Sequence, residues 1–266
     1  MLLRFTARRR RQVGEWLVEL MIVVFGVLIA LYAQQWANER QSLKAAKDAE
    51  TRIREEIYGN IANSVERIAV HRCLRDRLGQ IAERLNAGTN DWKAFAYDYT
   101  DNDLFLVRRI YRTPSRSISE DAYRGALASG ALDSVPVERR AMWSGLYGSF
   151  AKMQFVNNQE NERTSGLNSL WLNGEVLPGD RRELLQLVAR LDRDNGLITL
   201  ISKQNVDSLK ELGYALTAEE RGAFEKQLNN KAFDSSNTSL AMRRRVYGNC
   251  VDAEAFKLID PALKID

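Results

Sequence analysis

Residues 16–36 read WLVELMIVVFGVLIALYAQQW, and the chain is apolar without interruption from Leu20 to Ala33. About twenty helical steps of about 1.5 Å cover about 30 Å, which is the thickness of a bilayer's hydrocarbon core. Trp16 and Trp36 stand at the two ends of the stretch, where amphipathic rings meet the lipid headgroups. The stretch therefore predicts one transmembrane helix with an interfacial aromatic anchor at each end.

A block of arginines stands before the span and consists of Arg4, Arg8, Arg9, Arg10 and Arg11. By the positive-inside rule, the N-terminus stays in the cytoplasm and the chain after Trp36 lies across the membrane. We expect a single-pass protein of the bacterial inner (plasma) membrane with a periplasmic, extracytoplasmic C-terminal domain. A cleaved secretory signal is the alternative, but the apolar run is too long for one and no small-x-small pair follows it. An uncleaved anchor is favoured.

The net charge of +4 belongs mostly to this N-terminal region. Residues 1–33 hold five arginines and two glutamates, so they account for three of the four positive charges. Later basic runs, at Arg108–Arg109 and Arg243–Arg245, are typical of solvated faces rather than phosphate sites. We therefore predict no nucleic-acid partner. The lipid bilayer is the expected partner of the basic and apolar N-terminus.

Beyond the span, the chain predicts one long helix that ends near Gly88, because no proline interrupts it. Residues 34–51 are charged and are typical of a solvated stalk. An apolar stripe with steps of three and four follows. It consists of Ile53, Ile57, Ile61, Val65, Ile68, Leu74, Leu78, Ile81 and Leu85. Such a stripe is more often a core face of the same chain than a coiled-coil seam.

Helix-boundary signals continue along the second half of the chain. Residues 92–115 are rich in aromatics and predict a short helix or irregular chain. Ser119 is placed to cap a helix that Gly130 ends. Pro136 suits the first turn of the next helix, which extends toward Leu172.

Further signals divide the C-terminal region. Two amphipathic helices are predicted over residues 184–191 and 197–212, separated by the triplet Asp194, Asn195 and Gly196. Thr217 and Glu220 form a capping box before another helix, and Leu258, Ile259 and Leu263 are candidates to dock the tail.

These patterns predict an all-α protein: one N-terminal transmembrane helix that continues into a long amphipathic helix, then a helical bundle. No strand-like alternation is long enough to build a sheet. The predicted domains are a cytoplasmic basic segment (1–14), a transmembrane helix (15–36), a stalk and long amphipathic helix (37–90) and a helical extracytoplasmic domain (91–266).

Two segments carry a resemblance to a known family. The first is Gly26-Val27-Leu28-Ile29-Ala30-Leu31, followed by Trp36 and a charged helix. The second is Ala122-Tyr123, then Ala128-Ser129-Gly130-Ala131-Leu132, followed by a helix through Leu146 and Tyr147. Together they resemble an uncharacterised family of bacterial single-span membrane proteins with a helical extracytoplasmic domain. The resemblance implies location and a helical fold, and it brings no catalytic residues.

The chain has two cysteines, Cys73 and Cys250. In an oxidising compartment they are candidates for one disulfide that ties the C-terminal segment to the long helix. Two separate buried thiols are the alternative.

Signatures of catalysis and metal binding are sparse. His71 is the one histidine, so sites that need two histidines are excluded, and it does not share a helical face with Cys73. The sequence has no nucleophile elbow, Walker loop or dinucleotide-binding glycine motif. Carboxylate pairs such as Glu55–Glu56 and Glu160–Glu162 are typical of solvated helical faces. We predict no catalytic residues, no metal site and no cofactor.

The constellation that we single out is a stripe along the predicted span, formed by Glu15, Glu19, Gly26, Ala30, Ala33 and Ala37. Small residues four apart let a second membrane helix approach closely, and a carboxylate near lipid favours a facing donor or cation. The predicted partner is a second copy of the chain or another membrane protein. A plain anchor is the equally weighted alternative, with Glu19 reaching the headgroup layer.

Three functions fit these observations. The favoured one is a non-catalytic, membrane-anchored interaction or scaffold protein, a subunit or partner in an envelope complex. The second is a periplasmic ligand-sensing helical domain that acts through a partner, since few residues remain in the cytoplasm. The third is an envelope hydrolase with carboxylate acid–base chemistry, which requires a buried carboxylate in a cleft.

Overall fold

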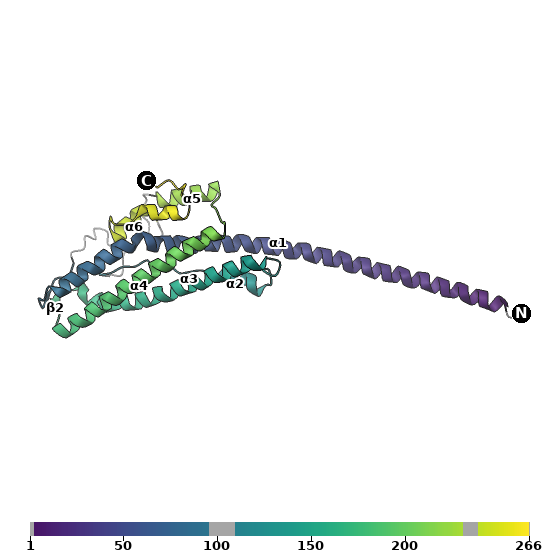
Figure 1. Ribbon diagram of the computed structural model, residues 1–266, viewed down its shortest axis with the longest axis horizontal. Coiled ribbons are helices and arrows are strands. Elements are labelled where there is room, and N and C mark those ends of the chain that lie inside the picture. The colour runs from purple at the N-terminus through teal and green to yellow at the C-terminus, as the bar shows by residue number, and fades with distance from the viewer. Residues whose placement is uncertain (1–2, 96–109, 231–238, 266) are drawn as a thin grey trace. The chain divides into compact units, whose positions relative to one another are not determined.

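The computed structural model describes residues 3–95, 110–230 and 239–265; the side chains of residues 3–15, 17 and 18 are not among those described. The fold of the described residues is all-α, as the sequence predicts (Figure 1). The described chain divides into two compact units. Unit 1 comprises Met1–Arg52 with Tyr123–Val135, and unit 2 comprises Ile53–Ala122 with Pro136–Asp266.

Helix α1 runs from Leu3 to Asn86 and contains both the apolar span and the amphipathic stripe. It ends close to the predicted position because Gly88 adopts a positive φ of 79°, which glycine tolerates without a side-chain clash. Except for the half-buried Ile68, the predicted stripe is buried, with Ile53, Ile57 and Ile61 at 0% exposure. The stripe is thus a core face of the same chain.

The core of unit 2 is built by α1 from residue 53 onward, α3 (Val137–Thr164) and α4 (Pro178–Glu211). The pairings of Glu56 with Tyr147 and of Arg67 with Glu160 show that α1 and α3 run in the same direction. Helix α4 runs antiparallel to both. The largest buried side chains of α3 are Trp143 and Phe150, both at 0% exposure, and their removal from water stabilises the fold.

The predicted break at Asp194, Asn195 and Gly196 is wrong, because α4 continues through these residues. Aspartate and asparagine disfavour helix interiors because their side chains compete for backbone hydrogen bonds. Here both side chains are buried and engaged by tertiary partners. Arg163 of α3 binds Asp194, and the Asn195 amide donates to the backbone oxygen of His71 over 3.3 Å.

The predicted caps before α2 (Asp121–Ala128) and α3 also differ in detail. Ser119 does not cap α2; its hydroxyl donates to Glu56 of α1 over 2.7 Å, and the same carboxylate accepts the backbone N–H of Ala122 over 2.9 Å. Glu56 therefore stabilises the start of α2 from a distant part of the sequence, where a negative charge is favourable. Pro136 is the N-cap of α3 rather than a residue of its first turn.

The predicted helix toward Leu172 is divided in two. Helix α3 ends at Thr164, and a tighter 3-10 helix, η1, covers Ser165–Trp171. A Cβ at Gly166 would lie 2.7 Å from the Leu187 side chain of α4, so a larger residue there would require that side chain to move. The glycine thus permits the close approach of η1 to α4.

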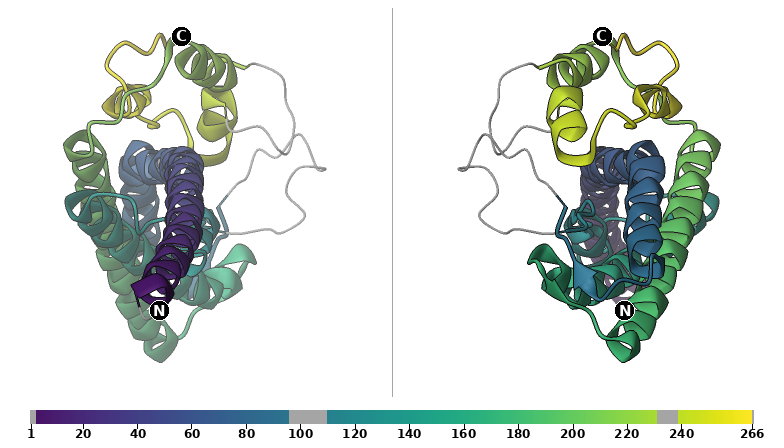
Figure 2. Two further views of the ribbon diagram at one scale, coloured as in Figure 1. Left: turned by 90° about the vertical axis from the view of Figure 1, so that its right-hand side faces the viewer. Right: turned by 90° about the vertical axis from the view of Figure 1, so that its left-hand side faces the viewer.

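The C-terminal region folds as α5 (Ala218–Leu228), α6 (Leu240–Tyr247) and the 3-10 helix η2 (Ala253–Leu258). The predicted capping box is confirmed, since Thr217 and Glu220 each bind the other's backbone. Phe256 and Leu263 are buried, whereas Leu258 is 38% exposed. Figures 1 and 2 show residues 53–86 of α1 lying between α3 and α4 on one side and α5 and α6 on the other.

A two-residue strand pair is the one addition to the predicted helices within the described residues. Strand β1 (Asp91–Trp92) pairs antiparallel with β2 (Gly174–Glu175). The backbone N–H of Val176 donates to Asn90 over 2.8 Å, which extends the pairing. The pair joins the chain after α1 to the turn between η1 and α4. Most of the aromatic segment 92–115 lies outside the described residues.

Unit 1 combines the first part of α1 with most of α2 and the segment that follows α2. Ala46 and Ala49 of α1 and Leu132 and Val135 of that segment are its buried apolar residues, joined by Ala126. The Ser42 and Ser134 hydroxyls lie 2.5 Å apart and link the two segments. Small alanines on α1 let the segment pack closely against the helix.

Candidate functional site

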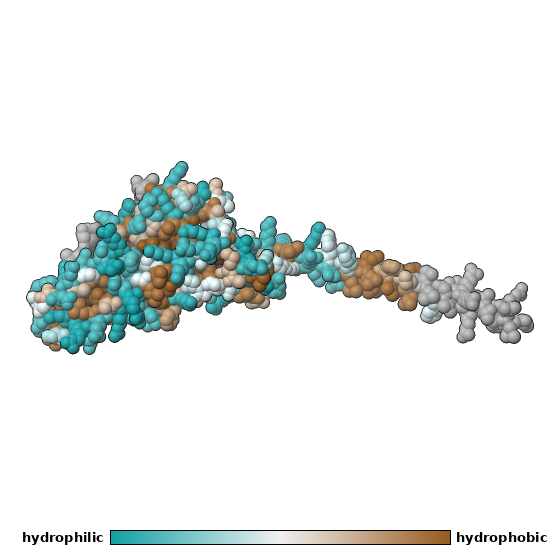
Figure 3. Space-filling view, in the orientation of Figure 1, coloured by the Kyte–Doolittle hydropathy of each residue, from teal (hydrophilic) through white to brown (hydrophobic). Residues whose placement is uncertain are grey.

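The apolar segment of α1 leaves its side chains uncovered. Every residue from Leu20 to Ala33 is exposed, and Ile22 and Ile29 each have 67% of their surface accessible. In the described part of the chain, α1 is the one helix long and apolar enough to cross a membrane. Figure 3 shows this segment as a continuous apolar stretch on the face in view. Apolar surface of this extent needs a non-aqueous environment or a partner.

The predicted association stripe lies along this band. Glu19, Gly26, Ala30, Ala33 and Ala37 are exposed, and a Cβ built on Gly26 meets nothing within 4 Å. The side chain of Glu15 lies outside the described residues, and so do the side chains of Arg4, Arg8, Arg9, Arg10 and Arg11. The structure thus holds the stripe on one continuous helix, with room for a second helix beside Gly26.

The two tryptophans at the ends of the span are accessible, with Trp16 at 76% and Trp36 at 50% exposure. The guanidinium of Arg40 lies 3.9 Å from the centre of the Trp36 ring, one helical turn further along α1. Both groups prefer the membrane interface, and a cation over an indole face is attractive.

Cys73 of α1 and Cys250 form a disulfide across 177 positions of sequence. The neighbouring backbone N–H of Asp252 also donates to the backbone oxygen of Ala69 over 2.9 Å. These two links fix the segment between α6 and η2 to the middle of α1. A cysteine held in this bond is not a metal ligand or a nucleophile.

A buried ion pair lies at the centre of the bundle, which corrects the prediction that Glu160 belongs to a solvated face. Glu160 has 0% exposure and accepts from Arg67 of α1 over 2.9 Å. The Tyr111 hydroxyl lies 3.5 Å from the same carboxylate, and burial raises its pKa well above the ordinary value. A buried carboxylate bound in this way is a structural charge, because its partner compensates it where water does not reach.

A second buried charge cluster joins α1 to α6. Glu66 is 2% exposed and accepts from the Nε atoms of Arg116, over 3.1 Å, and Arg243, over 3.2 Å. Arg243 is 6% exposed and lies 4.8 Å from the centre of the Phe256 ring. The expectation that Arg243–Arg245 form a solvated face is therefore wrong for Arg243, whose charge is compensated inside the fold.

Between these ion pairs and the start of the bundle lies a layer of neutral polar side chains. Asn205 of α4 donates to the Ser64 hydroxyl over 3.3 Å and accepts from Ser149 over 2.5 Å. The sulfur of Met153 accepts weak hydrogen bonds from Ser64 and Ser202, both over 3.5 Å. A buried polar layer of this kind fixes the register of packed helices, because a shift leaves its groups unsatisfied.

The sequence carries a signal for this polar core, which the prediction of solvated polar faces overlooked. Asn60, Ser64, Arg67 and His71 follow steps of four, three and four along α1, beside the apolar stripe. On α3, Asn157, Glu160 and Thr164 follow steps of three and four. Polar residues with helical periodicity next to an apolar stripe therefore indicate an inward polar face as readily as a solvated one.

His71 is half-buried, and its Nδ1 lies 3.0 Å from the Thr199 hydroxyl. Burial lowers its pKa, an effect to which the nearby Arg75 and Lys203 contribute. The described residues contain no group of three or more potential metal ligands. His71 borders a shallow groove of about 770 Å³ between α1 and α4.

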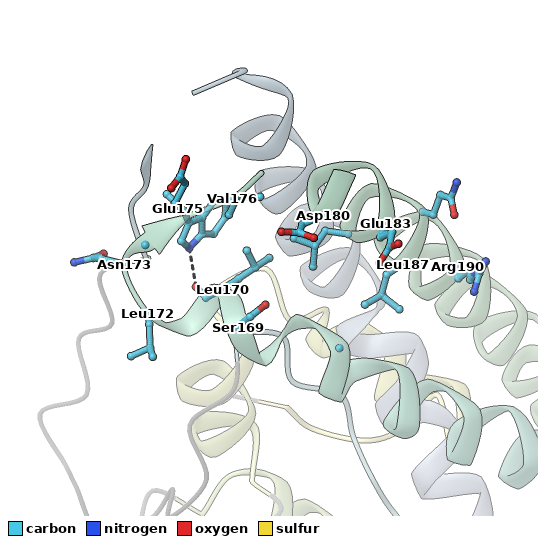
Figure 4. A pocket seen from close by; sticks show the side chains of 15 residues that line it. Ser169, Leu170, Leu172, Asn173, Glu175, Val176, Asp180, Glu183, Leu187 and Arg190 are labelled. Carbon is cyan, nitrogen blue, oxygen red and sulfur yellow. Dashed lines mark hydrogen bonds between the residues drawn. The ribbon is translucent and has the colours of Figure 1, made fainter. Parts of the chain in front are cut away.

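A pocket of about 710 Å³ opens where the strand pair meets the start of α4. Figure 4 shows Asp180, Glu183 and Leu187 of α4 across the opening from Ser169 and Leu170 of η1. The Trp92 indole forms part of its wall and donates to the Leu170 backbone oxygen over 2.8 Å. The carboxylates at this pocket, on Glu175, Asp180 and Glu183, are exposed to solvent.

No protein-family model, curated protein or solved structure matches this chain. Its own residues are therefore the basis for a function.

Proposed function

We propose that this chain is a single-pass, membrane-anchored interaction protein of the bacterial inner membrane, a non-catalytic subunit or scaffold of an envelope complex. Its N-terminus lies in the cytoplasm, and the helical domain that follows the span lies on the periplasmic side. The observation that carries the proposal is α1 itself. One helix presents an uncovered apolar segment and then supplies the central core element of a folded domain.

The orientation is supported by two independent features. The arginines before the span favour a cytoplasmic N-terminus. The disulfide between Cys73 and Cys250 belongs to the part of the chain after the span. Disulfides persist in oxidising compartments such as the periplasm and are rare in the cytosol. Both features support a periplasmic domain.

The non-catalytic assignment is supported by the buried carboxylates. Among the described residues these are Glu66, Glu160, Asp194 and Asp260, and each contacts an arginine. A general acid or base has to reach a substrate from a cleft, and these groups are instead neutralised within the fold. Exposed apolar residues on α3 and α4 offer contact area for a partner; Phe155 is 63% exposed, and Leu197 and Leu200 are neighbours on α4.

Reporter fusions test the orientation. Alkaline phosphatase is active only in the periplasm, so we expect activity from a fusion after Asp266 and none from a green fluorescent protein fusion at that position. Replacing Arg8, Arg9, Arg10 and Arg11 with serine should give mixed orientation, whereas lysine at the same positions should preserve it. An active fluorescent fusion in the native chain would refute the proposed orientation.

Purification of the full chain within a native lipid disc, followed by light-scattering mass and mass spectrometry, tests the assignment as a subunit. A companion chain at fixed stoichiometry is the expected result. A solitary chain would overturn the envelope-complex proposal and favour the ligand-sensing or hydrolase alternatives.

A further inference from the structure

A groove of about 480 Å³ lies between α1 and the C-terminal helices, within unit 2. Its walls are mostly apolar and include Ala62 of α1, Ala223, Phe224 and Leu228 of α5, and Ile259. Phe224 and Ile259 are partly exposed, so the groove opens to solvent. Its volume falls in the range of small-molecule pockets, which are typically apolar with a few placed polar groups.

Two polar side chains in the lining have buried atoms without a partner. The Nη1 of Arg243 has no acceptor, and the Tyr58 hydroxyl donates to no acceptor among the described residues, although the Arg54 guanidinium lies 5.3 Å from the centre of its ring. Arg243 is 6% exposed; its Nε donates to Glu66, and its guanidinium lies 4.8 Å from the centre of the Phe256 ring. A buried donor without an acceptor is costly, and a charged donor is more costly than a neutral one. Both side chains are donors that an anionic oxygen satisfies.

The charge balance around Arg243 favours an anion. Glu66 is shared by Arg116 and Arg243, so these three side chains carry a net charge of +1. The neighbouring pair of Arg67 and Glu160 is neutral. Burial, with a contribution from the nearby Arg116, lowers the pKa of Arg243, although Glu66 acts in the opposite direction.

The acidic residues of the groove do not neutralise the positive charge of Arg243. Glu220 is paired with Arg54 at 2.7 Å and also accepts from the Thr217 backbone. Glu55 is exposed at the rim, where water and salt screen its charge. The buried charge in the lining is therefore the cation of Arg243, whereas the acidic lining residues are paired or exposed.

We propose that this groove binds an aliphatic carboxylate of fatty-acid type, whose chain packs against α5 and whose carboxylate accepts hydrogen bonds at Arg243 and Tyr58. The inference stands apart from the proposed tethering function, because it depends only on side chains within unit 2. A carboxylate suits the site since guanidinium–carboxylate hydrogen bonds are among the strongest in proteins.

The test uses the full chain in zwitterionic phosphatidylcholine nanodiscs, with empty nanodiscs as background. A dansyl-labelled undecanoic acid is the fluorescent probe, and dodecanoate competes with it. We expect dodecanoate to displace the probe about tenfold more effectively than dodecan-1-ol, which has the same chain but no charge. Equal displacement by the acid and the alcohol would overturn the proposal.

Matched variants locate the site. Arg243→Met should weaken probe binding about tenfold or more, whereas Arg244→Met, an exposed neighbour on α6, should leave it unchanged. Ala223→Trp fills the groove from an exposed position without touching a charge, and Lys226→Trp adds the same ring to α5 outside the lining. Loss of binding in Ala223→Trp but not in Lys226→Trp supports the site even if Arg243→Met fails to fold. Full binding by Ala223→Trp contradicts it.

Discussion

Residues 20–33 and residues 53–85 belong to the same helix, but their side chains have different surroundings. The first segment is apolar on every face and is exposed along its whole length. The second buries one apolar stripe and, beside it, a polar stripe that ends in ion pairs with α3 and α6. Backbone hydrogen bonds are satisfied equally in both segments. The difference therefore lies in what surrounds the side chains, which is lipid in our proposal for the first and protein for the second.

In residues 53–85, helical periodicity locates the buried face more reliably than the polarity of the residues does. In residues 53–85, Ser64 and Arg67 are as buried as Ile61 and Val65. They tolerate burial because α3 and α4 supply partners for their polar atoms. In residues 20–33 no such partners are required, because those side chains carry no charge.

Removing one partner of the buried ion pair between Arg67 and Glu160 should have the largest effect on the stability of the second segment. Arg67→Met leaves Glu160 as an uncompensated buried charge, so we expect the free energy of unfolding to fall by about 3–5 kcal/mol. Chemical denaturation of the full chain, followed by circular dichroism, measures this loss. Arg67→Met combined with Glu160→Gln should recover most of it.

Arg72→Met is the matched control on the same helix. Arg72 is 80% exposed and pairs with Asp76, so its loss should cost less than about 1 kcal/mol. Equal effects of Arg67→Met and Arg72→Met would show that the pair of Arg67 and Glu160 is not buried as described.

The disulfide ties the second segment to the C-terminal region, and its removal should have the next largest effect. Cys73→Ser with Cys250→Ser frees a closed loop of 177 positions, and we expect a loss of about 2–5 kcal/mol, mainly through a less constrained unfolded chain. Thermal unfolding with and without a reductant measures it. If reduction shifts the native chain and leaves the double variant unaffected, the effect belongs to this bond.

A smaller, pH-dependent effect should arise at His71. Burial lowers its pKa below the ordinary 6.5, so the folded state favours the neutral ring. Stability from this group is present above about pH 6.5 and is lost as the pH falls through the lowered value. We expect the unfolding temperature to decrease between about pH 7.5 and 5.5, with a flatter profile for His71→Gln. Identical profiles would contradict the assignment to His71.

The first segment is expected to respond to changes that leave the second untouched. Gly26→Leu places a bulky side chain where a neighbouring helix would approach, so self-association or partner capture in a bilayer should weaken several-fold. Val24→Leu, on the opposite face of the helix, is the control. Förster transfer between labelled chains in liposomes measures the effect, and the unfolding of the helical domain should not change. Unaltered association in Gly26→Leu would leave the plain anchor as the function of this stripe.

Much of the fold follows from local pattern. The apolar helix at the N-terminus, its continuation to Asn86, the apolar stripe and the capping box at Thr217 are set by residues a few positions apart, and the structure agrees with each. The break predicted at Asp194 was wrong because its evidence was also local. Arg163 of α3 binds the Asp194 carboxylate there, and local spacing does not reveal this contact.

Most helices, and the segment apolar enough to cross a membrane, can be located from the sequence alone, because helical periodicity and span length are properties of contiguous residues. Only the tertiary structure decided which charges are buried. Glu160 and Glu162 look alike in the sequence, yet one meets Arg67 in the core. Only the tertiary structure brought Arg243 to an apolar groove, because α1, α5 and α6 meet there from distant parts of the chain. Such pairings depend on which helices face each other, and short-range spacing does not encode that.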